Sequence, residues 1–429
     1  MKPLFAAVLA LLLAAPAAAE VRTGIDRLQD EKFAPLADLA AKHGGKLRIG
    51  VLTNPIGIDA RGRRTIDVLR QDGEAAVPGL KVVKLFSGEH GIDAVIDGVV
   101  VDDTKDRASG LPVVSVYGAT DAQRHPPPAS LADLDAIVID LQDVGVRYWT
   151  FQTLTKYFLQ DSVLPKLEVV VLDRPNPIGG ILVQGPLSTP GRENYVNPFP
   201  EPMRPGMTMG ELAQLFNGEG RIGAKLTVVK ITGWKRSDWY DDTGLLWVNP
   251  SPNLRSLAQA TVYPGLALLE GANVHLKGPS EPPFVRFGAP WIKGSQLAAY
   301  LNARAIPGAK FMPVAYVPAG DAQYKFSGER VEGVEIIVTD RAVLDVPALG
   351  VEAVSALWKL YPATFQIDGT GSRRARTRGR LRPDGRRTWK ASRSSGRSTC
   401  YIPSYIFSPD IQSKIVYRWK IPPCCGGLL

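Results

Sequence analysis

Short apolar runs separated by helical patterns fill the first half of the chain. The runs lie at residues 47–53, 82–86, 113–117, 136–141, 169–172 and 226–231. They are continuously apolar rather than alternating, which is typical of strands covered on both faces. Helical patterns follow at residues 63–70, 151–159 and 208–217. This alternation predicts an α/β fold with a mostly parallel, doubly wound sheet.

Two local sequence signals mark the start and the end of the third predicted helix. Thr208 and Glu211 lie three residues apart at its start, where each side chain can accept an otherwise unsatisfied backbone N–H. Gly218, Gly220 and Gly223 after it form a literal G-x-G-x-x-G. A dinucleotide site needs a strand before the glycines and a helix after them, and here the order is reversed. We therefore predict a turn at these glycines and no bound cofactor.

The region after the sixth apolar run is predicted to form a separate domain. Residues 248–253 hold two prolines in six positions, which indicates a domain boundary. A strand at 334–339 and a helix at 350–360 are predicted beyond it. We therefore expect a larger domain at residues 20–250 and a second one at 251–370.

The N-terminus has the parts of a secretory signal peptide. Lys2 supplies the positive start, residues 4–15 are apolar, and Pro16 precedes three alanines. The alternative is an uncleaved anchor, but the apolar run is short for a membrane span. We predict a signal peptide at residues 1–19, a periplasmic or secreted mature protein, and no stable membrane span after signal removal.

Charge is distributed very unevenly along the 429 residues. The formal net charge is +9, but residues 371–429 alone carry 14 Lys and Arg against 2 Asp and Glu, a net of +12. Residues 1–370 are therefore mildly acidic, which removes the electrostatic argument for nucleic-acid binding by this part of the chain. All three cysteines lie in the basic segment, at Cys400, Cys424 and Cys425. Three cysteines in so long a chain do not make a disulfide scaffold.

The basic segment itself has two interpretations. It begins abruptly with eight arginines between residues 373 and 387 and shows no apolar periodicity. A basic arm for nucleic acid or anionic lipid is one interpretation. We favour the other, a non-native or disordered tail such as the product of a shifted reading frame.

Polar side chains follow four of the predicted strands. In open α/β sheets ligands bind outside the carboxyl ends of the strands, so these side chains should meet in one crevice. They include four carboxylates, two arginines, two amides, a histidine and two aromatic rings: Glu89, Asp140, Asp143, Asp173, Arg147, Arg174, Asn54, Asn176, His90, Tyr148 and Trp149.

Carboxylates and aromatic rings with few histidines favour glycoside hydrolysis, in which one carboxylic acid protonates the leaving oxygen. Glu89 is the best candidate because neighbouring glycines let the backbone approach a ligand closely. The aspartates serve equally well as caps or ion pairs, and His90 as a turn residue. The arginines would suit a sugar that bears a carboxylate. The four histidines are scattered, so we expect no metal site.

Many of these residues belong to motifs that resemble one bacterial family, the exo-β-N-acetylmuramidases of glycoside hydrolase family 171. The resemblance extends from about Gly50 to about Phe365. The motifs occur in the family's order, as TNPIG at 53–57, GEHG at 88–91, DLQDVGVRY at 140–148, LDRPNP at 172–177, GMT at 206–208, GEL at 210–212, GW at 233–234, PSPN at 250–253, YPG at 263–265 and GAPW at 288–291.

The resemblance implies a Rossmann-like N-terminal domain and a smaller α+β C-terminal domain with the active site between them. It implies release of N-acetylmuramic acid from the non-reducing end of peptidoglycan fragments. The family glutamate proposed as catalytic falls on Glu89. The lactyl carboxylate of muramic acid would give Arg147 or Arg174 a partner.

One loop departs from the family pattern. Where the family has an S-E-G-R-G-T-T type loop, this chain has His275, Leu276 and Lys277, followed by GPS at 278–280. The acidic and arginine positions of that loop look lost. A muropeptide-binding or catalytically impaired envelope protein is therefore the alternative function. An envelope protein whose basic tail binds an anionic polymer is a third hypothesis.

Overall fold

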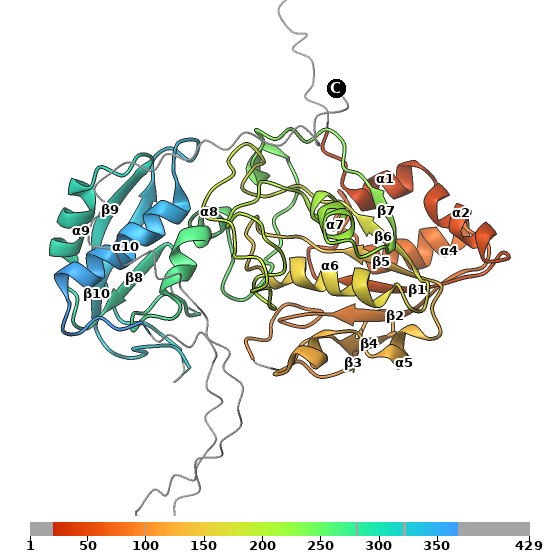
Figure 1. Ribbon diagram of the computed structural model, residues 1–429, viewed down its shortest axis with the longest axis horizontal. Coiled ribbons are helices and arrows are strands. Elements are labelled where there is room, and N and C mark those ends of the chain that lie inside the picture. The colour runs from red at the N-terminus through yellow and green to blue at the C-terminus, as the bar shows by residue number, and fades with distance from the viewer. Residues whose placement is uncertain (1–19, 99, 280–281, 321–322, 368–429) are drawn as a thin grey trace, which may run out of the picture. The chain divides into compact units, whose positions relative to one another are not determined.

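The computed structural model describes residues 20–98, 100–279, 282–320 and 323–367. The predicted signal peptide and basic tail lie outside these ranges. A seven-stranded sheet forms the first part, with its strands in the order β3-β4-β2-β1-β5-β6-β7 (Figure 1). Their bounds are β1 (Leu47–Thr53), β2 (Leu80–Ser87), β3 (Thr104–Lys105), β4 (Pro112–Ser115), β5 (Ala136–Asp140), β6 (Glu168–Leu172) and β7 (Lys225–Val229).

The direction of winding changes once in this sheet. All strands run parallel except β3, which pairs antiparallel with β4 at one edge. The chain goes outward from β1 to β2 and β4, then returns to β5 on the other side of β1. A crevice at such a reversal is where doubly wound sheets bind ligands. The predicted parallel, doubly wound sheet is confirmed.

Both faces of the central strands β1, β5 and β6 are covered, which explains their nearly continuous apolar runs. On one face Ile49 and Val51 pack in a core with Leu28 and Leu36, from helices α1 (Gly24–Asp30) and α2 (Ala34–Lys42). Helices α6 (Thr150–Asp161) and α7 (Met209–Gly218) lie over the other face (Figure 1). Shorter helices are α3 (Thr65–Val68), α4 (Glu74–Ala76) and α5 (Pro128–Leu131).

The capping prediction is confirmed at α7. The Thr208 hydroxyl accepts from the Glu211 N–H at 3.2 Å, and the Glu211 carboxylate accepts from the Thr208 N–H at 3.1 Å. The three glycines after this helix lie in its last residue and the turn leading to β7, as predicted.

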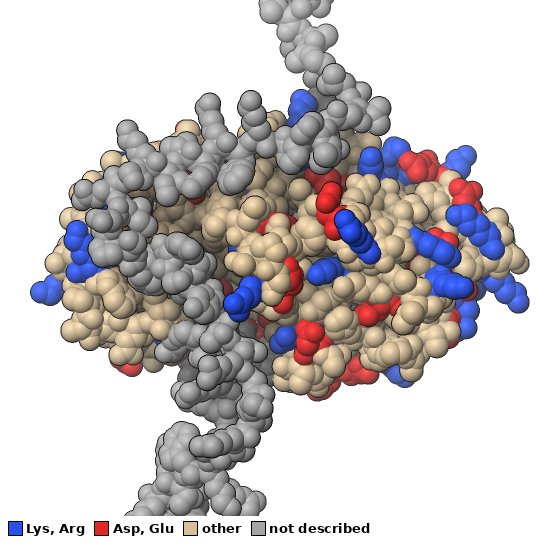
Figure 2. All heavy atoms as spheres, viewed as in Figure 1, with Lys and Arg blue, Asp and Glu red and all other residues tan. Residues whose placement is uncertain are grey.

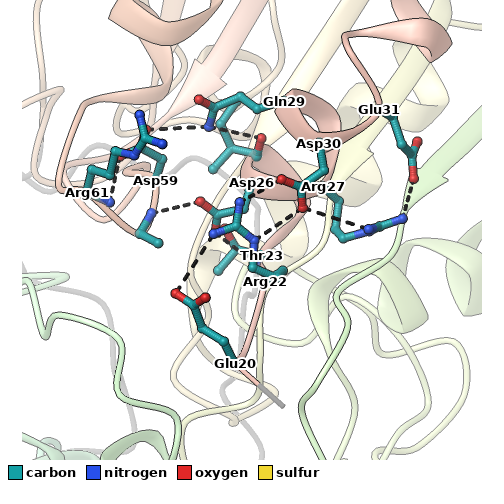
Figure 3. Close-up of polar contacts among 12 residues, drawn as sticks. Glu20, Arg22, Thr23, Asp26, Arg27, Gln29, Asp30, Glu31, Asp59 and Arg61 are labelled. Carbon is teal, nitrogen blue, oxygen red and sulfur yellow. Dashed lines mark hydrogen bonds and ion pairs between the residues drawn. The ribbon is translucent and has the colours of Figure 1, made fainter.

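A polar network ties α1 to the loop that follows β1 (Figure 3). Asp26 accepts hydrogen bonds from the Thr23 N–H at 3.0 Å and from the Ala60 N–H at 2.8 Å. Asp59 in the same loop accepts from the Gln29 amide at 3.4 Å and from Arg63 at 2.9 Å. The network therefore fixes the backbone just beyond the carboxyl end of β1, where we predicted the ligand crevice.

A smaller antiparallel sheet follows, with its strands in the order β8-β10-β9. Its strands are β8 (Arg286–Ala289), β9 (Ala309–Tyr316) and β10 (Val331–Val338), and its helices are α9 (Gly294–Ala303) and α10 (Val346–Leu360). Helix α8 (Leu257–Leu266) meets α10 through two glycines. A Cβ on Gly350 would lie 2.2 Å from the Gly265 carbonyl oxygen, so only glycine permits this approach. The second, smaller α+β region is confirmed, while the exact domain limits stay a prediction.

Charges of both signs are interspersed over the described residues on the face shown in Figure 2. In the described part of the chain, no helix combines the length and apolar character needed to cross a membrane.

Candidate active site

Glu89 lies directly beyond β2, at the edge where the parallel strands end. Gly88 before it packs against α6, because a Cβ there would lie 2.2 Å from Cδ1 of Leu154. His90 and Gly91 after it adopt left-handed φ values of 73° and 76°. Strand β2 therefore ends in a sharp turn that brings Glu89 to the start of α6.

Two hydroxyl groups hold the Glu89 carboxylate. Tyr117, just after β4, donates to one oxygen at 2.8 Å, and Thr150, the first residue of α6, donates to the other at 3.1 Å. Glu89 itself is half-buried. A carboxyl group that is oriented on both oxygens and still reachable is suited to general acid–base chemistry.

Tyr195 and Arg124 extend this group of residues. The ring centroids of Tyr117 and Tyr195 are 6.1 Å apart, and Cζ of Arg124 lies 4.3 Å from the Tyr195 ring centroid. Burial, with a smaller contribution from the charge of Glu89, raises the pKa of Tyr195 well above its ordinary value. Tyr195 is 6% exposed and therefore buried, whereas Arg124 is half-buried.

A hollow of about 150 Å³ opens at the end of β1. Asn54 lines it, together with Arg64 and, from the turn after Glu89, Ile92 and Asp93. Asn54 Oδ1 accepts from the Ile56 N–H at 3.1 Å, while its Nδ2 is buried without a hydrogen-bond partner. Asn54 thus lines the hollow, and its Nδ2 is an unsatisfied buried donor.

The turn after Glu89 is closed and anchored. The Nδ1 atom of His90 lies 2.6 Å from the Ile96 carbonyl oxygen, so this imidazole holds the turn, which is the alternative role we gave it. Asp97 accepts from the Asn253 amide at 2.9 Å and from the Tyr324 hydroxyl at 3.2 Å. Asn253 and Tyr324, which follow the seven-stranded sheet in the chain, therefore contact the segment just after the Glu89 turn.

Asp140 and Arg174 form a buried ion pair. Arg174 donates to both oxygens of Asp140, at 2.5 and 2.9 Å, and Thr65 also donates to this carboxylate. The two side chains are 0% and 2% exposed. Arg174 donates once more to the Ile58 carbonyl at 2.8 Å. The pair thus joins β5 and β6 to the loop after β1.

Asp173 and Asn176 are likewise engaged in local structure. Asp173 accepts from the Gly210 N–H at 2.7 Å and from the Thr208 hydroxyl at 3.1 Å, and so caps α7. Burial raises the pKa of Asp173 to about 6. Asn176 donates to the Met207 carbonyl at 2.9 Å and accepts from the Ile178 N–H at 3.1 Å.

The segment from Arg147 to Trp149 makes backbone and ring contacts. Arg147 donates to the carbonyls of Glu201 and, at 3.0 Å, Pro186, and burial lowers its pKa. The Tyr148 hydroxyl donates to the carbonyls of Tyr263 and Pro264, at the end of α8. Trp149 packs edge-on against the Tyr263 ring at 5.7 Å. These contacts join the start of α6 to α8.

Asp143 and Glu201 are buried carboxyl groups with unsatisfied oxygens. Asp143 accepts from the Gly145 and Val146 N–H groups through Oδ1, while its Oδ2 has no partner. Burial raises the pKa of Asp143 to about 7. Both carboxyl oxygens of Glu201 are buried without a partner, and burial, together with Asp143, raises the pKa of Glu201 well above its ordinary value.

Four of the residues in this arrangement escaped the sequence analysis: Tyr117, Arg124, Thr150 and Tyr195. Tyr117 ends an apolar run and Thr150 precedes a helical pattern, so their positions at strand and helix ends were available signals. Tyr195, like Glu201, lies in a Pro- and Asn-rich stretch without periodicity, and nothing in the sequence marks it. Across the described ranges, no group of three or more His, Cys, Asp or Glu side chains is placed to hold a metal ion.

Comparison with known proteins decides the family. Residues 49–258 match the family described as "Exo-beta-N-acetylmuramidase NamZ, N-terminal", and residues 261–390 match its C-terminal counterpart. The chain belongs to the NamZ exo-β-N-acetylmuramidase family. The C-terminal match extends beyond Phe365, the last residue of the resemblance in sequence motifs, and includes the first part of the basic segment.

Relatives of known sequence or structure are similar over most of the chain. A protein of Bacillus subtilis strain 168, named peptidoglycan beta-N-acetylmuramidase NamZ, is 37% identical over 355 residues, which are 82% of this chain and 81% of the relative. A crystal structure of a DUF1343 family protein from Bacteroides fragilis superposes with a TM-score of 0.70 at 32% identity, covering 80% of this chain and 84% of that one. A second one from the same organism has a TM-score of 0.59 at 22% identity, with 79% and 84% covered, and shows the same fold.

Proposed function

We propose that this protein is an exo-acting glycoside hydrolase that releases N-acetylmuramic acid from the non-reducing end of peptidoglycan fragments. The observation that carries the proposal is the match to both parts of the NamZ family, together with 37% identity to a relative named peptidoglycan beta-N-acetylmuramidase. The position of Glu89 supports it, because the carboxyl group is half-buried at the ligand-binding edge of the sheet.

Glu89 acts in this proposal as the general acid and base. Its carboxyl group gives a proton to the glycosidic oxygen as the bond from the sugar C1 to that oxygen breaks. It then takes a proton from the water that attacks C1, which returns it to the acid form. Tyr117 and Thr150 orient the carboxyl group for both transfers. The substrate's 2-acetamido group is available to support the cationic centre.

Hydrolysis of a chromogenic β-N-acetylmuraminide tests this proposal. We expect turnover by the wild type and a loss of about 100- to 10,000-fold in the Glu89→Gln variant, because the amide cannot supply the proton. Glu352→Gln is the matched control, since Glu352 lies on α10 in an exposed ion pair with Arg304. If Glu89→Gln hydrolyses the substrate at the wild-type rate, Glu89 is not the general acid and base.

The altered loop favours a second candidate function, binding of muropeptides without turnover. His275 stands where the resemblance to the family leads us to expect a serine. The residue is 1% exposed, and its Nδ1 lies 3.0 Å from the Tyr316 hydroxyl. Burial lowers the pKa of His275 to about 4, so the ring is neutral at physiological pH. This candidate predicts that the wild type binds N-acetylmuramic acid but releases no chromophore.

We also propose that the protein is exported and takes part in cell-wall turnover and recycling. The charged start, short apolar run and alanine-rich site at residues 1–19 support export. Expression of the full chain in a bacterium followed by fractionation tests it. We expect the mature protein in the periplasm or medium with an N-terminus near Glu20, and a cytoplasmic protein that starts at Met1 would contradict export.

A further inference from the structure

We infer that Arg124 is the residue that recognises the lactyl carboxylate of the N-acetylmuramic acid unit, and that it thereby sets specificity against N-acetylglucosamine. The inference rests on the proposed function and adds a specificity residue to it. N-acetylmuramic acid differs from N-acetylglucosamine by a lactic acid ether, so a cation that binds the lactyl carboxylate is the simplest way to tell the two sugars apart.

The two arginines that the sequence offered for this role are already engaged. Arg174 is 2% exposed and holds Asp140, and Arg147 donates to two backbone carbonyls. Each would have to give up these contacts to bind a ligand, and Arg174 would leave a buried carboxylate behind. The cost of such an exchange argues against both as carboxylate receptors.

Arg124 has the opposite properties. Within the described ranges, its side chain donates one hydrogen bond, from Nε to the Gly118 carbonyl at 3.0 Å, and no carboxylate pairs with it. The edge of the guanidinium with its two terminal NH2 groups therefore remains for a ligand. That edge presents two parallel donors, which is the geometry that grips a carboxylate at both oxygens.

The position of Arg124 is fixed by a short helix and by an aromatic ring. It ends the 3-10 helix η2 (Asp121–Arg124), which Thr120 and Gln123 cap reciprocally. Its guanidinium stacks on Tyr195, 4.3 Å from the ring centroid, and Tyr195 in turn lies beside Tyr117, which donates to Glu89. Two aromatic rings thus separate the cation from the catalytic carboxyl group. In this inference the sugar ring lies at Glu89 and its lactyl arm extends along the two rings toward Arg124.

Competitive inhibition by two sugars tests the assignment: N-acetylmuramic acid and the methyl ester of its lactyl group. In Arg124→Gln we expect binding of the acid to weaken about 10- to 100-fold, because charge-assisted hydrogen bonds are lost. Binding of the uncharged ester should stay within about twofold of wild type, because it offers no carboxylate to a cation. Arg124→Lys should keep part of the preference for the acid, since the charge remains. Arg304→Gln, on an exposed ion pair far along the chain, is the control.

Two outcomes would overturn the inference. If Arg124→Gln weakens acid and ester equally, Arg124 acts only by supporting Tyr195. If it weakens neither, the carboxylate binds elsewhere. The proposed function fails by a different result, the absence of chromophore release by the wild type, so the two failures are distinguishable.

Discussion

Arg174 donates to both carboxylate oxygens of Asp140, at 2.5 and 2.9 Å, although 34 positions separate the two residues in the chain. They follow or end adjacent strands, β6 and β5, at the edge that carries Glu89. A buried pair of this kind costs desolvation free energy when it forms, but breaking it leaves an uncompensated charge, which costs more.

Removal of one partner should therefore destabilise the fold strongly. We expect Arg174→Met to lower the free energy of unfolding by about 3–5 kcal/mol, because the Asp140 carboxylate stays buried. Urea unfolding followed by circular dichroism measures it. Glu352→Gln, which breaks an exposed pair, should cost less than about 1 kcal/mol. If Arg174→Met loses as little unfolding free energy as Glu352→Gln, the buried pair contributes little to stability.

Thr150 should act as a positioning residue for Glu89. We expect Thr150→Val to lower kcat by about 10-fold with KM within about twofold, because one hydrogen bond to the carboxylate is lost and the side chain keeps its shape. Thr150→Ser restores the hydroxyl and should recover most of kcat. Steady-state kinetics on the chromogenic muraminide gives kcat and KM for both variants. Equal losses in both variants would mean that packing at the start of α6, rather than the hydroxyl, is responsible.

Asp143 makes stability depend on pH in an unusual direction. Burial raises its folded-state pKa from 3.8 to about 7, so the folded state binds the proton more tightly than the unfolded state. Its contribution to stability is therefore full below about pH 4 and falls as the pH rises to about 7. Three units of pKa correspond to at most about 4 kcal/mol, with about 1–3 kcal/mol expected in practice.

Unfolding free energies at pH 4.5 and pH 8 measure this effect. Asp143→Asn keeps the Oδ1 acceptor for Gly145 and Val146 and should shrink the difference between the two pH values. Asp106 serves as a control because its pKa is shifted in the opposite direction. Burial alone would raise the pKa of Asp106, but hydrogen bonds from Arg64 and Ser109 hold it at about 2, so its contribution is lost only in strong acid. An unchanged difference in Asp143→Asn would refute the assignment.

Thr208 links the cap of α7 to Asp173. We expect Thr208→Ala to lower the free energy of unfolding by about 1–2 kcal/mol, since the Glu211 N–H and the Asp173 carboxylate both lose a partner. Thr208→Ser keeps the hydroxyl and should cost much less. Thermal unfolding of the two variants in parallel gives the comparison, and similar midpoints would show that the hydroxyl contributes nothing.

The sequence by itself determined the layered architecture and the edge of the sheet at which the parallel strands end. Continuous apolar runs require cover on both faces, and strand–helix alternation requires a parallel sheet, so the strand ends had to meet. The same pattern placed Glu89 just after a strand, at the carboxyl end of the sheet, and predicted the cap at Thr208. It did not find α1, α2 or α8.

Only the tertiary structure decided which polar groups are engaged with one another. Asp140 and Asp173 were equally acceptable as ligands or as structural groups until Arg174 and α7 were seen to hold them. Tyr117, Thr150 and Arg124 come together because the strand order brings β2, β4 and the start of α6 to one place. The aperiodic stretch around Tyr195 places its ring against Tyr117 and Arg124. Periodicity is set by local backbone geometry, whereas hydrogen-bond partners are set by contacts between residues far apart in the chain.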